Sequence, residues 1–95
     1  KALDDIPTAR EAGFKSLEFD GLVGLLGPRE VTPAVRDRIA ADIRQVVSDP
    51  EVETKLAGTG QVVNPGTPAE FTEALEDQLK TVRQIGETLG IKPAQ

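Results

Sequence analysis

Residues 67–89 read TPAEFTEALEDQLKTVRQIGETL, and this stretch combines a helix start with a long apolar stripe. Thr67 precedes Pro68, which suits the first helical position because the amide that proline lacks would have no partner there. Glu70 follows Thr67 at the spacing of a capping box. The large apolar residues recur every three or four positions: Phe71, Leu75, Leu79, Val82, Ile85 and Leu89. We therefore predict an amphipathic helix over 68–89.

Two earlier helix starts have the same design, with a capping side chain directly before a proline at Thr32-Pro33 and Asp49-Pro50. The first is followed by an apolar stripe that steps by four, four and three, made of Val35, Ile39, Ile43 and Val46. The second carries a shorter stripe that stops at a glycine-rich turn. The pattern predicts helices over 33–48 and 50–57.

The N-terminal part also contains a capping-box spacing, between Thr8 and Glu11, and Gly13 can supply a left-handed helix stop. These signals predict a short helix over 8–13.

The sequence between these helices predicts two strands. Leu17 to Asp20 alternate between apolar and polar side chains, and the following run to Leu26 is almost wholly apolar and bounded by glycines. This favours one main strand over 17–26, buried on both faces in its second half. A short second strand is predicted over 61–63. One long strand with a single short companion cannot form a stable sheet, so the missing strands must come from a larger α/β domain or from self-association.

Composition excludes several classes of function. The 95 residues include no Cys, His, Trp, Tyr or Met, so zinc sites and cysteine or serine–histidine nucleophiles cannot be built. We expect no enzyme activity, no catalytic residue, no metal site and no cofactor. The net charge of −5 and the scattered bases argue against nucleic acid as a partner. No apolar run is long enough for direct membrane insertion.

Several motifs together resemble one family, the substrate-binding proteins of tripartite tricarboxylate transporters, which are Bug-type periplasmic receptors. The matching stretches, in the order of that family, are 5–13 (DIPTAREAG), 24–28 (GLLGP) with 32–33 (TP), 49–52 (DPEV), 66–71 (GTPAEF) and 90–93 (GIKP). Two departures stand out. The family often has an aromatic pair where this chain has Gly21-Leu22-Val23-Gly24, and the loop before Thr32 is about one residue longer.

The resemblance implies an α/β fold, with residues 1–95 forming a single partial domain, the C-terminal part of a two-domain, type II periplasmic-binding-protein-like receptor. Such a receptor captures small carboxylates by domain closure, without covalent chemistry, and delivers them to membrane transporter subunits. It also implies a periplasmic location. The chain itself shows no signal peptide, since Lys1 begins directly in acidic, proline-containing sequence.

The candidate ligand-binding residues are Thr8, Asp20 and Gly21. Thr8 is most simply a helix cap, yet a helix N-terminus with free amides and a hydroxyl also favours an anion, and the resemblance places Thr8 beside the hinge. Glu18 and Asp20 lie two apart on the predicted strand and could form a carboxylate pair. Nothing in the sequence would tune either pKa, so a solvated strand face is the better interpretation.

An alternative of another class is a self-associating interaction module, or a proteolytic remnant without ligand binding. The observation that supports this alternative is the unpaired apolar run at the end of the predicted strand 17–26. In this interpretation that strand pairs across two copies of the chain as a homo-oligomer.

Overall fold

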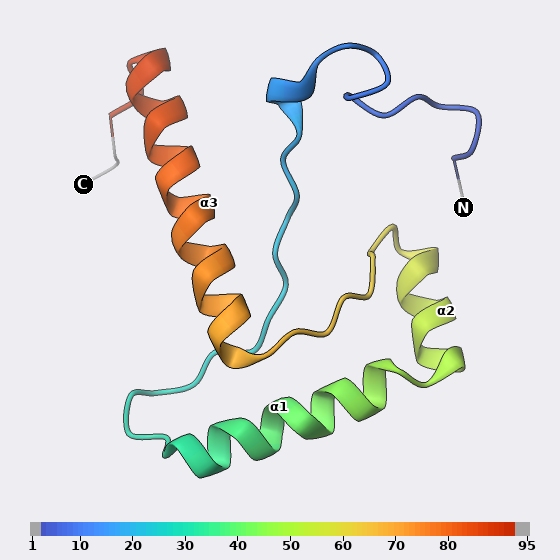
Figure 1. Cartoon of the computed structure of the whole chain (residues 1–95), viewed down its shortest axis with the longest axis vertical. Coiled ribbons are helices and arrows are strands. Elements are labelled where there is room, and N and C mark those ends of the chain that lie inside the picture. The colour runs from blue at the N-terminus through green and yellow to red at the C-terminus, as the bar shows by residue number, and fades with distance from the viewer. Residues whose placement is uncertain (1–2, 93–95) are drawn as a thin grey trace.

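Three helices and one short 3-10 turn make up the regular structure of the computed structural model, which describes residues 3–92. The elements are η1 (Lys15–Leu17), α1 (Pro33–Val47), α2 (Pro50–Gly58) and α3 (Pro68–Leu89). Figure 1 shows α1 along the lower edge, α3 standing above it at one side and α2 at the other side. Residues 1–2 and 93–95 of the predicted single domain 1–95 lie outside the described residues, and these include Lys1 and Pro93.

The three predicted helix starts are confirmed atom by atom. The Thr32 hydroxyl accepts a hydrogen bond from the Val35 amide at 3.3 Å, and Asp49 Oδ1 accepts from the Glu51 amide at 2.8 Å. At α3 the capping box is complete. The Thr67 hydroxyl accepts from the backbone amide of Glu70 (3.2 Å), whose carboxylate accepts from the Thr67 amide (2.7 Å). Each cap satisfies amides that have no partner inside the helix.

The predicted helix over 8–13 is wrong, because this segment forms turns only. Its capping box is nevertheless present, with the Thr8 amide bonded to Glu11 Oε2 at 2.8 Å and the Glu11 amide to the Thr8 hydroxyl at 3.2 Å. Gly13 takes a φ of 91° and ends the turn. One turn does not offset the entropy of helix nucleation, so a good cap alone produces a turn.

The α/β prediction is also wrong: neither 17–26 nor 61–63 forms a strand, and no strand occurs anywhere in residues 3–92. Residues 15–17 form η1, and the segment after it runs extended beside α3 (Figure 1). No hydrogen bond between backbone groups involves residues 19–27. A strand requires a neighbouring strand to pair with its amides and carbonyls, and the described chain offers none.

The elements lie in a single flat layer of 41 × 40 × 20 Å. No residue of the described chain is buried, so the apolar stripes of the helices stay largely exposed. A stable domain usually packs two layers of secondary structure around a core. None of the helices in residues 3–92 is long and apolar enough to cross a membrane.

Candidate functional site

An ion pair joins the N-terminal turn to the extended segment. Arg10 Nε lies 2.6 Å from Glu18 Oε1, and Arg10 Nη2 lies 2.7 Å from Glu18 Oε2, which is a two-point contact. Hydrogen bonding to the guanidinium lowers the pKa of Glu18 from its ordinary value, and the same bond raises the pKa of Arg10. Both groups are well exposed, so the pair orients the turn more than it stabilises the fold.

Thr8, the first candidate ligand residue, lies in this turn. Its amide and its hydroxyl are both engaged by Glu11. An anion binding here would have to displace the Glu11 carboxylate, which already occupies the position that an anion would take at the start of the turn. In this conformation Thr8 therefore acts as a cap, and its role as a ligand residue stays a prediction.

Asp20, the second candidate, is held against α3. Its backbone carbonyl accepts a hydrogen bond of 2.6 Å from Gln78 Nε2, across 58 positions of sequence. A shallow cavity of about 210 Å³ lies at this junction. It is lined by Glu18, Phe19, Asp20 and Leu22 on the segment and by Ala74, Asp77, Gln78 and Thr81 on α3.

This cavity has an acidic lining. Glu18, Asp20 and Asp77 contribute carboxylates, and no lysine or arginine lines it. These carboxylates would repel a carboxylate ligand unless positively charged groups from elsewhere lay beside it. Thr8 and Gly21 do not line the cavity, so the structure does not gather the three candidate residues around one pocket. The described residues also contain no cluster of potential metal ligands.

The far carbons of the Phe71 ring, Cζ, Cε1 and Cε2, lie close to Gly24. A Cβ atom built on Gly24 would overlap the ring carbons, whereas a Cβ on Gly21 would meet nothing within 4 Å. Phe71 and Gln78 anchor the extended segment to α3, a role that the sequence pattern did not predict. The glycine inside an apolar run was the one available signal, since such a glycine often marks a close approach.

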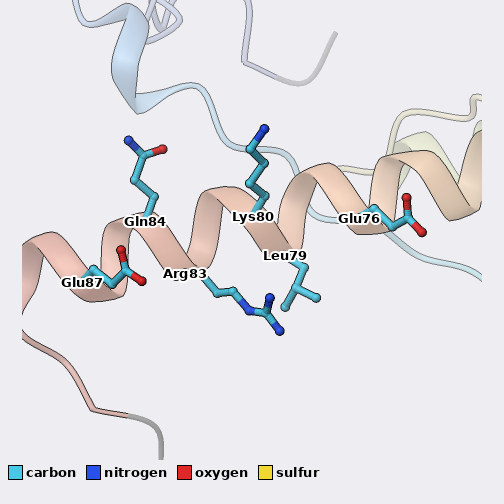
Figure 2. Close-up of a pocket in the computed structure, with 6 residues that line it drawn as sticks. All are labelled: Glu76, Leu79, Lys80, Arg83, Gln84 and Glu87. Carbon is cyan, nitrogen blue, oxygen red and sulfur yellow. The ribbon is translucent and has the colours of Figure 1, made fainter.

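The outer side of α3 carries a second, open depression of about 600 Å³, shown in Figure 2. All of its lining residues come from α3 itself: Glu76, Leu79, Lys80, Arg83, Gln84 and Glu87. Leu79 and Arg83 project to one side of the helix, and Lys80 and Gln84 project to the other (Figure 2). Residues that diverge around one helix cannot enclose a small molecule, so this depression is not a ligand site.

Comparison with known proteins gives one partial similarity. The chain is 23% identical over 86 residues to a UPF0065 protein in the TAR-I ttuE-ttuC' intergenic region of Agrobacterium vitis. The matched part covers 87% of this chain and 25% of that protein, so the chain spans about a quarter of the length of its relative. No protein-family model and no solved structure matches.

Proposed function

We propose that this chain is part of an extracytoplasmic, Bug-type solute-binding protein that captures small carboxylates for a tripartite tricarboxylate-type transporter. The similarity to the UPF0065 protein carries the proposal, because that family corresponds to the Bug receptors. The ordered motifs at 5–13, 49–52 and 66–71, which resemble the same receptors, support it independently of overall identity.

In this proposal the ligand lies between this 95-residue chain and other parts of a longer protein. Two observations support a site that is shared in this way. The candidate residues do not share a pocket in the chain, and the cavity beside Asp20 is acidic. The cavity lining itself supplies no positive charge, and Arg10, the nearest base described above, is already paired with Glu18; in this proposal other parts of the protein supply the charged groups that hold the carboxylate. Thr8 contributes its hydroxyl once the ligand displaces Glu11.

Calorimetry on two proteins tests this proposal: the 95-residue chain and a longer gene product that contains it. Titration with citrate and with aspartate should show binding to the longer protein and none to the chain alone. Micromolar binding by the chain alone would contradict the shared site. Failure of the longer protein to bind any of a panel of di- and tricarboxylates would contradict a carboxylate receptor.

A matched pair of variants in the longer protein tests Thr8. Thr8→Val removes the hydroxyl and should weaken carboxylate binding about tenfold, as for other hydrogen bonds to charged groups. Thr88→Val is the control, since the Thr88 hydroxyl bonds only the Gln84 carbonyl within α3. Equal affinities for the two variants would show that the Thr8 hydroxyl does not bind the ligand.

A further inference from the structure

One hydrogen bond fixes the orientation of the peptide group between Asp20 and Gly21. The Asp20 carbonyl accepts from Gln78 Nε2 on α3 at 2.6 Å. The described residues contain no cis peptide bond, so this peptide group is planar and trans. In a trans peptide group the carbonyl and the following N–H point in opposite directions. Because the Asp20 carbonyl points towards α3, the Gly21 N–H points away from that helix.

Gln78 belongs to the face of α3 that contacts the extended segment. Phe71, Ala74 and Gln78 are half-buried and follow one another at spacings of three and four, which places them on one side of the helix. All three lie against the extended segment. Gln78 is the polar member of this row, and a half-buried polar group without a partner would cost free energy. The bond to the Asp20 carbonyl therefore holds both the side chain and the peptide group in place.

The Gly21 N–H is an accessible donor. No hydrogen bond between backbone groups involves residues 19–27, and within residues 3–92 only the carbonyl of the Asp20–Gly21 peptide group is hydrogen-bonded. A Cβ atom on Gly21 would meet nothing within 4 Å, so a ligand can approach the backbone closely at this glycine. The bond from Gln78 to the carbonyl also polarises the peptide group, which makes its N–H a stronger donor.

The Gly21 N–H lies on the side of the segment that faces away from the acidic cavity. That cavity lies between the segment and α3, where Glu18, Asp20 and Asp77 line it. Gly21 does not line the cavity, and its N–H points away from α3. A carboxylate that approached this N–H would therefore not have to enter the acidic cavity, where like charges would repel it.

We propose that the Gly21 N–H binds a carboxylate oxygen of the ligand and that Gln78 is the residue that positions this N–H. The inference rests on the proposed function, to which it adds one uncharged donor from this chain beside the charged groups of other parts of the protein. A backbone N–H suits this role, because hydrogen bonds to an ionised acceptor are about twice as strong as those between neutral groups. Gln78 itself does not touch the ligand and acts through the peptide group that it holds.

Two substitutions at one position test the donor, in the longer protein that contains this chain. Gly21→Pro removes the N–H and should weaken the binding of citrate or aspartate at least about tenfold in calorimetry. Gly21→Ala keeps the N–H, and its methyl group meets nothing in the chain, so its affinity should stay within about twofold of that of the unmodified protein. Equal affinities for the two variants would overturn the role of the Gly21 N–H.

Nuclear magnetic resonance tests the same donor without a proline. In the longer protein with isotope-labelled glycine, the Gly21 amide proton should move downfield when citrate or aspartate is added, and the spectrum of Gly21→Ala assigns its signal. Without ligand this proton should exchange rapidly with solvent. Slow exchange in the absence of ligand would show that another part of the protein already accepts from Gly21, and would overturn the proposal.

Gln78→Leu tests the positioning residue, with Gln84→Leu as the matched control about a third of a turn away around the same helix. Gln78→Leu can no longer hold the Asp20 carbonyl and should weaken carboxylate binding about threefold to tenfold, and the ligand-induced shift of the Gly21 proton should shrink. Gln84→Leu should change neither. A purely structural role of Gln78 would lower the midpoint of thermal unfolding but leave the Gly21 shift intact, and that result would overturn the positioning role.

The same experiments separate this inference from the proposed function. If the unmodified longer protein binds no carboxylate, the proposed function fails and this inference fails with it. If that protein binds citrate or aspartate and Gly21→Pro binds it equally well, the inference alone is wrong.

Discussion

Gly24 shows how much a single residue decides in this molecule. Its lack of a side chain lets the Phe71 ring lie against the extended segment. Gly24→Ala should therefore lower the free energy of unfolding by about 1 kcal/mol or more, since overpacking a close contact forces the ring aside. The midpoint of urea denaturation, followed by far-UV circular dichroism, measures the change.

Gly21→Ala is the control for this substitution. Neither glycine has a positive φ, so alanine reduces the entropy of the unfolded chain equally at both positions. At Gly21 the new methyl group meets nothing, and the variant should be neutral or slightly more stable. If both variants behaved alike, the contact between Gly24 and Phe71 would have no role in stability.

At the scale of single elements, the capping box of α3 offers the clearest substitution. Thr67→Ala removes the acceptor of the Glu70 amide and should destabilise the helix by about 1 kcal/mol, with a lower midpoint of thermal unfolding at 222 nm. Thr72→Ala is the control. The Thr72 hydroxyl bonds the Pro68 carbonyl inside the helix, where alanine is the better helix former. An equal loss in both variants would contradict a specific role for the cap.

At the scale of the whole molecule, the helices of residues 3–92 enclose no core, since none of these residues is buried. Its 8816 Å² of accessible surface compares with about 14,600 Å² for the unfolded chain and about 5,300 Å² for a compact domain of this mass. Folding of a single chain therefore buries roughly six-tenths of the surface that a compact domain would bury. Helix caps and local hydrogen bonds therefore contribute most of the folding stability of the described chain. The apolar stripes contribute little while their side chains stay exposed to solvent.

This deficit predicts the response of the whole chain to urea. The dependence of the unfolding free energy on urea scales with the surface exposed on unfolding. The chain should show a urea m-value of about six-tenths of that of a compact 95-residue domain. An m-value typical of a compact domain would contradict the flat single layer.

The sequence by itself determined the three α-helices and the residues at which they begin. Predicted and observed ends of α1 and α2 differ by one residue, and both ends of α3 agree. The reason is that caps act locally: Thr32, Asp49 and Thr67 bond amides two or three residues away, so their effect can be inferred from spacing alone. The apolar periodicity also predicted which face of each helix is apolar.

The tertiary structure decided what the segment 17–26 becomes. Its alternation and apolar run are typical of a strand, but a strand exists only when a neighbour pairs with its backbone groups. Here Gln78 and Phe71, far along the sequence, anchor the segment to a helix instead. The same holds for the candidate site. Spacing can nominate Thr8, Asp20 and Gly21, but only the arrangement of the chain in space determines whether they share a pocket, because contacts across many residues leave no periodic signal.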